Sequence, residues 1–269
     1  MTTSKLNLTT LKTVAIIQAR MSSSRLPGKV LKEAGGRPLL SRMVERVRRA
    51  KLVNETVVAT TVDPSDDVLA EFCQVENLPF YRGNLMDVLD RYYQTALAHQ
   101  ADIVVRLTGD CPFIDPDLVD ETIQALLTQN ADFACNRLPP PLTRTYPIGL
   151  DVEVCTFEAL TRAWREAKEK HEREHVMPYL YEVPGRFKVL KVDYPIDYGD
   201  LRWTVDTPQD LEFVKAVYEK LDNRNDFTWL DVLKIVQASP EIQDINAGVA
   251  HKSMFDVDER NKKESKADK

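Results

Sequence analysis

The sequence has little that is typical of a zinc-binding, disulfide-rich or membrane protein. Its 269 residues include four cysteines, which are widely separated and form no CxxC pair: Cys73, Cys111, Cys135 and Cys155. We therefore expect reduced thiols and a cytoplasmic protein. The first ten residues are polar, and no apolar run approaches the roughly 20 residues of a membrane span. We expect neither a standard export signal nor a membrane anchor.

A general excess of basic residues is also missing. The formal net charge is −6, whereas nucleic-acid-binding proteins usually carry a strong positive excess, so we expect no nucleic-acid partner. Residues 20–51 depart from this balance, with ten Lys or Arg against two acidic residues. A basic segment in an acidic protein favours a small polyanionic ligand. For residues 42–51 alone, a solvent-exposed helix face is the simpler alternative.

Short apolar runs alternate with amphipathic segments through the first half of the chain. We expect strands near residues 14–17, 56–61, 80–81 and 102–107. Each is followed by a segment of helical spacing, at residues 38–47, 65–76, 84–99 and 115–127. This alternation predicts an α/β protein with three layers, in which a mostly parallel sheet carries helices on both faces.

The regular alternation ends after Asp132. A proline-rich stretch, a strand, a helix interrupted at Pro178, another strand and two more helices follow, at about residues 137–147, 152–155, 157–182, 187–192, 209 onward and 229 onward. We expect a single domain over residues 13–246, with an insertion at about 137–185 of the kind that carries binding loops. Residues 1–12 and 247–269 are predicted to be flexible.

The loop after the first strand is rich in groups that bind phosphate. It is Arg20-Met21-Ser22-Ser23-Ser24-Arg25-Leu26-Pro27-Gly28-Lys29. Ligands of open α/β sheets bind beyond the carboxyl ends of the strands, and cationic side chains, hydroxyls and free N–H groups suit phosphate oxygens. The loop matches neither GxxxxGK followed by Ser or Thr nor GxGxxG, which disfavours a P-loop ATPase or an NAD dehydrogenase.

Several separated motifs resemble one family. Gln18-Ala19-Arg20 and Arg25-Leu26-Pro27-Gly28-Lys29 resemble the opening signature of the CMP-sugar synthetases, the cytidylyltransferases that activate 3-deoxy-manno-octulosonate and the sialic acids. The sequence is most similar to the branch called spore coat polysaccharide biosynthesis protein F, over most of residues 14–246. The resemblance implies a nucleotide-diphospho-sugar transferase-like fold, CTP or another NTP, a sugar-like acceptor, Mg²⁺ or Mn²⁺, and a homodimer.

Two aspartates are the predicted metal ligands. Asp110 follows the strand at residues 102–107, where a carboxylate can hold a metal over phosphates, although capping of the turn explains it equally well. The segment at residues 202–211 resembles the VDTPEDL motif of the family, which makes Asp206 the second ligand and places Asp210 at a helix start. The predicted catalytic residues are Arg20, Lys29, Asp110 and Asp206.

The resemblance also assigns the remaining site residues. The predicted nucleotide-binding residues are Ala19, Arg20, Ser23, Ser24, Arg25, Lys29, Arg82, Thr108, Gly109 and Asp110, with Arg82 facing the base. The neighbouring Asp87 and Arg91 are equally explained by a surface salt bridge at i and i+4. The segments YPIGLDVE and REHV imply an acceptor site made by Tyr146, Glu153, Arg173 and His175. Glu153 is equally explained as an exposed strand residue.

Two short motifs have simpler explanations. Residues 171–175 match HExxH, but their flanks are heavily charged and the match overlaps REHV, so we do not expect a zinc protease. Asp115-Pro116-Asp117 matches the DxD motif of many glycosyltransferases. An N-cap aspartate, a proline at the first helical position and an acid in the first turn explain it without a metal.

The leading hypothesis is transfer of CMP from CTP to a sugar or keto-sugar acceptor, with release of pyrophosphate, for surface polysaccharide or glycoconjugate synthesis. Three alternatives stay open at this point. They are a sugar-1-phosphate nucleotidyltransferase that uses another NTP, a glycosyltransferase with a nucleotide-sugar donor, and a CTP-binding regulatory protein without turnover.

Overall fold

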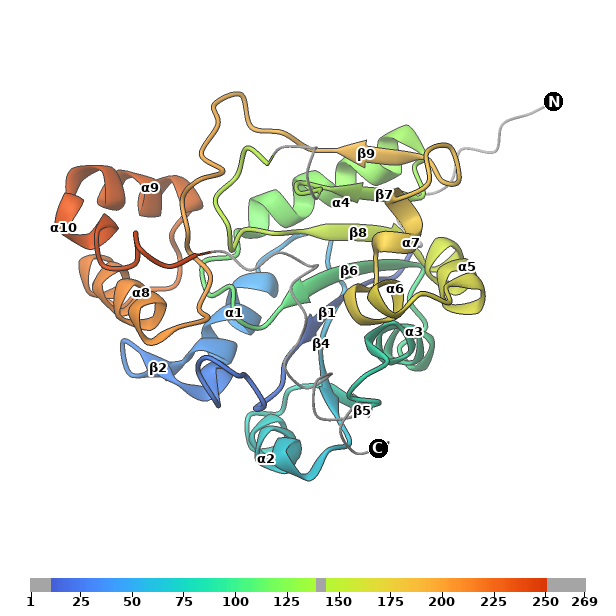
Figure 1. Cartoon of the computed structure of the whole chain (residues 1–269), viewed down its shortest axis with the longest axis horizontal. Coiled ribbons are helices and arrows are strands. Elements are labelled where there is room, and N and C mark those ends of the chain that lie inside the picture. The colour runs from blue at the N-terminus through green and yellow to red at the C-terminus, as the bar shows by residue number, and fades with distance from the viewer. Residues whose placement is uncertain (1–10, 139–143, 251–269) are drawn as a thin grey trace, which may run out of the picture.

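The computed structural model describes residues 11–138 and 144–250, and within them seven strands form one sheet. The strand order is β5-β4-β1-β6-β8-β7-β9 (Figure 1). The strands are β1 Thr13–Gln18, β4 Glu55–Thr61, β5 Phe80–Gly83, β6 Ile103–Thr108, β7 Phe133–Cys135, β8 Glu153–Thr156 and β9 Val189–Lys191. Neighbours are parallel except for β8, which runs antiparallel to β6 and β7. The prediction of a mostly parallel sheet is confirmed.

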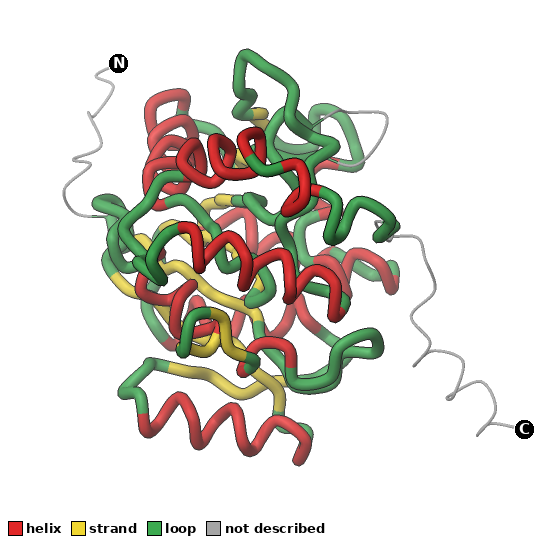
Figure 2. Tube along the Cα trace, turned by 90° about the vertical axis from the view of Figure 1, so that its left-hand side faces the viewer, coloured by secondary structure: helices red, strands yellow, loops and turns green. Residues whose placement is uncertain are grey.

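Helices cover both faces of this sheet. They are α1 Leu39–Val47, α2 Asp67–Val75, α3 Val88–Ala98, α4 Pro116–Gln129, α5 Phe157–Glu166, α6 Lys170–His175, α7 Pro178–Tyr181, α8 Pro208–Lys220, α9 Trp229–Ala238 and α10 Pro240–Gln243, with short 3-10 helices η1 Lys29–Leu31 and η2 Pro64–Asp66. A separate hairpin pairs β2 Glu33–Ala34 with β3 Arg37–Pro38. Figure 2 shows the strands enclosed between the helices.

The alternation of side chains along β1 explains why two helical layers form. Ala15 and Ile17 pack in a core with α1, α4, α8 and α9, whereas Val14 and Ile16 pack with α3, α5 and α7. Successive side chains of a strand point to opposite faces, so an unbroken apolar run needs cover on both sides. The predicted three-layer α/β architecture is therefore confirmed.

Helix starts follow the expected capping chemistry. The carboxylate of Asp63 accepts the N–H of Ser65 at 2.9 Å, directly before η2. The carboxylate of Asp115 accepts the N–H groups of Asp117 and Leu118 at 2.8 and 3.4 Å, directly before α4. Its other oxygen accepts the N–H of Trp229 at 2.6 Å. The DxD match is thus a helix cap that also holds α9.

Several boundaries differ from the prediction. The segment at residues 157–182 forms three helices, because a capping box between Glu169 and Glu172 begins α6 anew after α5 has ended. The helix expected from residue 84 begins at Val88, since the Asn84 side chain accepts the N–H groups of Met86 and Asp87 in a turn before it. Strand β7 and the β2–β3 hairpin were not predicted, as runs of two or three residues show no period.

The basic segment at residues 42–51 has two parts: Arg48, Arg49 and Lys51 are exposed, as expected for a solvated face, whereas the two arginines of α1 are not. Arg42 and Arg46 are fully buried, so they are neither available to bind a polyanion nor part of a solvent-exposed face. The guanidinium of Arg42 donates to the backbone carbonyls of Ala34, Gly35 and Asn223. That of Arg46 donates to the backbone carbonyls of Ile114, Asn225 and Phe227. Burial lowers the pKa of both arginines. They satisfy carbonyls of irregular segments that would otherwise be buried without donors.

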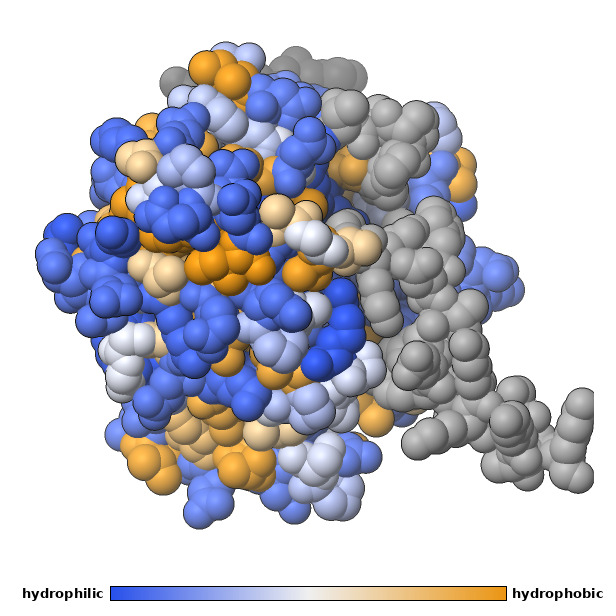
Figure 3. All heavy atoms as spheres, turned by 60° about the vertical axis from the view of Figure 1, so that its left-hand side comes forward, coloured by the Kyte–Doolittle hydropathy of each residue, from blue (hydrophilic) through white to orange (hydrophobic). Residues whose placement is uncertain are grey.

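The expected flexible ends fall mainly on residues 1–10 and 251–269, which lie outside the described residues. Lys12 was also expected to be flexible, but it lies among the described residues, and its N–H donates to the carboxylate of Asp102 at 2.7 Å. No helix in the described ranges combines the length and apolar character that a membrane span requires. The side of the molecule that carries α8 to α10 presents mainly hydrophilic residues with apolar areas between them (Figure 3).

Candidate active site

The candidate site lies at the edge of the sheet where β1 and β6 end. These parallel strands are in register up to Gln18 opposite Thr108, so the loops that follow leave the sheet together. The N–H of Gly109 donates to the Gln18 carbonyl at 2.8 Å. A Cβ at Gly109 would stand 3.1 Å from that carbonyl oxygen. Glycine at this position therefore lets the loop before Asp110 pass close to the end of β1.

Backbone contacts bring the Asp206 segment to Asp110. The Val205 N–H donates to the carbonyl of Asp110 at 2.8 Å, and the Thr204 hydroxyl donates to the same oxygen at 3.3 Å. Trp203, in the same segment, is buried and contacts Phe113 edge to face. Two acids that are distant in the sequence are thus held side by side by a packed, hydrogen-bonded backbone.

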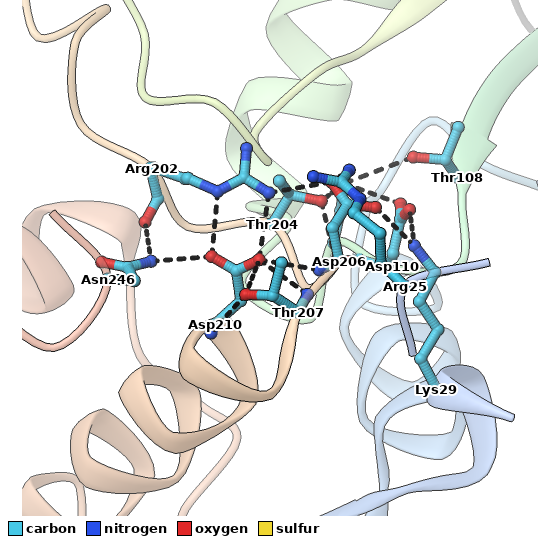
Figure 4. Close-up of polar contacts among 11 residues, drawn as sticks. Arg25, Lys29, Thr108, Asp110, Arg202, Thr204, Asp206, Thr207, Asp210 and Asn246 are labelled. Carbon is cyan, nitrogen blue, oxygen red and sulfur yellow. Dashed lines mark hydrogen bonds and ion pairs between the residues drawn. The ribbon is translucent and has the colours of Figure 1, made fainter. Parts of the chain in front are cut away.

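The Lys29 ammonium lies between the two carboxylates. Its Nζ donates to Asp110 Oδ2 at 2.6 Å and to Asp206 Oδ1 at 2.8 Å (Figure 4). The Lys29 side chain is 11% exposed, and those of Asp110 and Asp206 are 22% and 20% exposed. Burial alone would lower the pKa of Lys29, but its attraction to the two aspartates prevails and raises it. The three predicted residues therefore form one partly accessible ionic cluster.

Two arginines complete the surroundings of Asp206. Arg25 Nη2 is 2.9 Å and Arg202 Nη2 is 2.8 Å from Asp206 Oδ2. Burial alone would raise the pKa of Asp206, but the charge of Lys29 and hydrogen bonds from Lys29 and Arg202 prevail and lower it. Asp206 is consequently ionised at neutral pH. Arg25 was predicted, whereas Arg202 was missed, although it stands four residues before Asp206 in the same motif.

The other loop residues lie at the same edge. Ala19 is buried and donates its N–H to Ala59 at 3.2 Å, Ser23 donates its N–H to Met21 at 2.9 Å, and Ser24 is exposed. Burial lowers the pKa of Arg20, opposed by the charges of Glu174, Asp66 and Asp110. The Thr108 hydroxyl lies 3.3 Å from the sulfur of Cys111. Of these residues, Arg20 is near enough to feel the charge of Asp110, and the phosphate-binding roles of the others stay predictions.

Arg82 has protein partners at the turn after β4. Its Nε donates to the carbonyl of Thr61 at 2.7 Å, and its Nη2 donates to Asp67 at 2.6 Å and to the carbonyl of Asp63 at 3.2 Å. These contacts hold its guanidinium against the neighbouring turn. Its contact with a base stays a prediction.

The alternative of a surface pair between Asp87 and Arg91 is wrong. Arg91 is fully buried and donates to the carbonyl of Asn84 at 2.8 Å. Asp87 instead caps α3 and accepts Arg173 Nη2 from α6 at 2.5 Å. Arg173 also donates to the carbonyl of Trp164 at 2.7 Å. The predicted acceptor residue Arg173 therefore connects α6 to the start of α3.

The segment of Tyr146 runs beside the segment that carries Asp206. The Ile148 N–H donates to Leu201 at 2.8 Å, and the Trp203 N–H donates to Ile148 at 2.7 Å. Gly149 has a φ of 107°, and a Cβ there would stand 2.6 Å from the Thr204 nitrogen. Tyr146 itself is 3% exposed. Its ring packs against the rings of Tyr194 and Trp229.

Glu153 is a buried residue that forms an ion pair inside the sheet. It is 4% exposed and lies opposite Arg106 in the register of β8 and β6, and the two side chains form a short ion pair. Burial alone would lower the pKa of Arg106, but the charge of Glu153 prevails and raises it. The alternative of an exposed strand residue is wrong for Glu153. Its role toward an acceptor stays a prediction.

The HExxH match lies on a short helix. Helix α6 has six residues, His175 is its last residue, and His171 Nε2 lies 2.9 Å from Glu182 Oε2. In the described ranges no group of three or more His, Cys, Asp or Glu is arranged to hold a metal. Asp110 and Asp206, which both contact Lys29, are only two carboxylates and so do not form such a group of three.

Comparison with known proteins decides which family this site belongs to. A family model described as Cytidylyltransferase matches residues 14–233. The chain belongs to the cytidylyltransferase family. This cytidylyltransferase family member is accordingly a nucleotidyltransferase enzyme, and the family resemblance of its separated motifs is confirmed.

Individual relatives agree with this assignment. The spore coat polysaccharide biosynthesis protein SpsF of Bacillus subtilis is 34% identical over 84% of this chain and 94% of its own. The 3-deoxy-manno-octulosonate cytidylyltransferase of Chloroherpeton thalassium is 31% identical over 51% of this chain and 54% of its own. The structure of a cytidylyltransferase from Leptospira borgpetersenii aligns with a TM-score of 0.82 at 32% identity, covering 90% of this chain and all of that one. The nucleotide-diphospho-sugar transferase-like fold is thereby confirmed.

Proposed function

We propose that the protein transfers CMP from CTP to a sugar or keto-sugar acceptor and releases pyrophosphate, in the synthesis of a surface polysaccharide or glycoconjugate. The observation that carries the proposal is the Lys29 ammonium bound by both Asp110 and Asp206, with Arg25 on the same carboxylate. Similarity to a spore coat polysaccharide protein and to a 3-deoxy-manno-octulosonate cytidylyltransferase supports the choice of CTP and of a sugar.

Mg²⁺, or Mn²⁺ in its place, is the metal that suits this site. Asp110 and Asp206 already share one cationic group, the Lys29 ammonium, so their oxygens are close enough to serve one cation. Two carboxylates, substrate phosphates and water are the ligand set that Mg²⁺ usually takes. When bound, the metal would polarise the α-phosphate and neutralise the charge of the departing pyrophosphate.

The cationic loop supplies the binding of the triphosphate. In this proposal, Arg25 and Lys29 exchange part of their contacts with Asp206 for phosphate oxygens, so cations already present in the cluster meet the negative charge of CTP. Arg20 and these two residues hold the triphosphate in line with the acceptor oxygen, which lowers the entropic part of the barrier. In this proposal, Ala19, Ser23, Ser24, Thr108 and Gly109 line the nucleotide, and Arg82 faces the base.

The acceptor enters beside the segment at residues 146–151, which is hydrogen-bonded to the Asp206 segment. The proposed acceptor residues are those predicted from the sequence, Tyr146, Glu153, Arg173 and His175. Among them, Glu153 and Arg173 already pair with Arg106 and Asp87, so their contribution to the acceptor must add to a structural one. A cytoplasmic location and a homodimer stay predictions.

Pyrophosphate release in the presence of Mg²⁺, measured with each of the four NTPs against a panel of sugars, keto-sugars and sugar phosphates, tests the proposal. We expect release with CTP and one class of acceptor, and none without acceptor or with a chelator. Release with another NTP and a sugar 1-phosphate would favour that alternative. Consumption of a nucleotide sugar without pyrophosphate would favour a glycosyltransferase, and CTP binding without any turnover a regulatory protein.

A further inference from the structure

The Asp206 carboxylate is held from two directions. Figure 4 places it between Lys29 and Asp110 on one side and Arg202 and Asp210 on the other. Its Oδ1 accepts Lys29, whereas its Oδ2 accepts Arg202 Nη2 at 2.8 Å. We infer that Arg202, Asp210 and Asn246 are positioning residues, which fix the Asp206 carboxylate in the direction that binds the divalent cation. The inference rests on the proposed function.

Arg202 connects two carboxylates through one rigid group. Besides its contact with Asp206, it donates from Nε to Asp210 Oδ1 at 2.9 Å and from Nη2 to Asp210 Oδ2 at 3.0 Å. The side chain of Arg202 is 6% exposed and that of Asp210 is fully buried. A planar guanidinium that is gripped in this bidentate way has a fixed orientation. The direction of its contact with Asp206 is therefore set by Asp210.

Asp210 also holds the backbone of Asp206. Its Oδ2 accepts the N–H groups of Asp206 and Thr207, each at 2.9 Å, and the Thr207 hydroxyl at 3.0 Å. The contact with Thr207 is the ordinary capping box of α8. The contacts with the Asp206 N–H and with Arg202 go beyond a cap, because they fix both the backbone and the side chain of the proposed metal ligand.

Asn246 extends this network to the segment after α10. Its Nδ2 donates to Asp210 Oδ1 and to the carbonyl of Arg202, each at 3.0 Å, and the residue is 5% exposed. A single amide group thus holds both members of the pair that orients Asp206. Asn246 itself contacts Asp206 through neither bond, so any effect of its removal on cation binding must pass through Asp210 and Arg202.

Removal of Asp210 should weaken cation binding for two physical reasons. Partners that orient a metal ligand typically contribute about 10–100-fold to metal affinity. Without the charge of Asp210, the full charge of Arg202 also acts on Asp206 and competes with the cation for it. Both effects have the same sign.

The start of α9 offers a matched control. Asp231 occupies the same position of a capping box as Asp210, with Thr228 in place of Thr207. Its side chain contacts Thr228 and Lys234, and it is 42% exposed. Asp210→Asn and Asp231→Asn therefore make the same change in a capping box, but the first also removes the charge that holds Arg202.

The test is the Mn²⁺ affinity of the protein at saturating CTP, measured from the electron paramagnetic resonance signal of free Mn²⁺ after subtraction of the Mn²⁺ that the same concentration of CTP binds without protein. We expect the Kd for Mn²⁺ to rise about 10-fold or more in Asp210→Asn and about 3-fold or more in Asn246→Ala. Asp231→Asn should stay within about 2-fold of the wild type, because its cap lies away from the cation. Binding of CTP in the presence of a chelator should change little in all three variants.

Equal Mn²⁺ affinity in Asp210→Asn and Asp231→Asn would overturn the inference, since Asp210 would then be a helix cap alone. If Asp210→Asn does not fold, Asn246→Ala decides, and an unchanged affinity in that variant would overturn the inference as well. Failure of the proposed function has a different signature. A wild-type chain that binds no Mn²⁺ together with CTP contradicts that function, and the positioning role falls with it.

Discussion

The ionic cluster at Asp206 and the ion pair at Glu153 use the same kinds of group in different ways. Asp206 faces three cationic groups, two from the loop after β1 and one from its own segment, and its side chain is 20% exposed. Glu153 pairs with Arg106 across two strands, and its side chain is 5% exposed. A cluster with several cations can pass some of them to a phosphate ligand, whereas a one-to-one buried pair cannot open without leaving an uncompensated charge. Accessibility and the number of partners therefore distinguish a binding cluster from a structural pair.

The largest expected effect concerns the buried ion pair of Glu153 and Arg106. Glu153→Gln leaves the Arg106 charge buried without its partner, which should lower the free energy of unfolding by about 3–5 kcal/mol. Urea denaturation measures the loss. The double variant Arg106→Met, Glu153→Met should recover much of it, because apolar replacement of a buried pair is often nearly neutral. A Glu153→Gln protein of normal stability that has lost acceptor turnover would instead assign Glu153 to the acceptor.

The next effect concerns the ionic cluster of Lys29, Asp110 and Asp206. Asp110→Asn removes one of the two charges that hold the cation and should lower kcat by about 10²–10³, the size seen when one electrostatic contact to the transition state is lost. Its thermal midpoint should change little, because Lys29 keeps its contact with Asp206. Steady-state pyrophosphate release measures kcat. Unchanged turnover would remove Asp110 from the reaction.

A smaller effect separates the buried arginines of α1 from the exposed arginines that follow the helix. Arg42→Met leaves the buried carbonyl of Ala34 and the part-buried carbonyls of Gly35 and Asn223 without this donor and should cost about 1–3 kcal/mol of stability. Arg48→Met, an exposed control on the same segment, should stay within about 0.5 kcal/mol. CTP affinity should be the same in both variants. Weaker CTP binding in Arg42→Met at normal stability would restore the polyanion interpretation.

The smallest effect concerns how far the openness of the site extends. All four cysteines lie among the described residues, and each is buried and free. Burial raises the pKa of Cys73 to about 11 and that of Cys111, beside Asp110, well above its usual value, so both are protonated thiols at pH 8. A thiol reagent at pH 8 should therefore react slowly with the native protein. In denaturant, the same reagent should label all four thiols. Fast labelling of native Cys111 would show that the site opens further than described.

Topology explains why much of the site was predictable from the sequence. Parallel strands end at one edge of a sheet, so the loop after β1 and the turn after β6 were expected at the same edge, and the strand order of the structure makes them neighbours. The family resemblance of the motif around Asp206 added the third segment. These three signals were enough to predict that Lys29, Asp110 and Asp206 come together.

Partners of buried charges were not predictable in the same way. An arginine that satisfies carbonyls, such as Arg46, has the same letter and helical spacing as one that faces solvent. Glu153 alternates in its strand as an exposed residue would, and its burial depends on Arg106 in a strand that is far away in sequence. Asn246 contacts both Arg202 and Asp210, at the two ends of the motif around Asp206, and no sequence pattern near Asn246 indicates these contacts. Such pairings are decided by the packed fold rather than by local sequence.

A crystal structure with CTP and Mn²⁺, read from the anomalous signal of manganese, tests the central claim most directly. We predict one manganese peak bonded to a carboxylate oxygen of Asp110 and to one of Asp206, with Lys29 moved onto phosphate oxygens. A peak that touches neither aspartate, or bound CTP with Lys29 still between the two carboxylates and no manganese, would contradict the account.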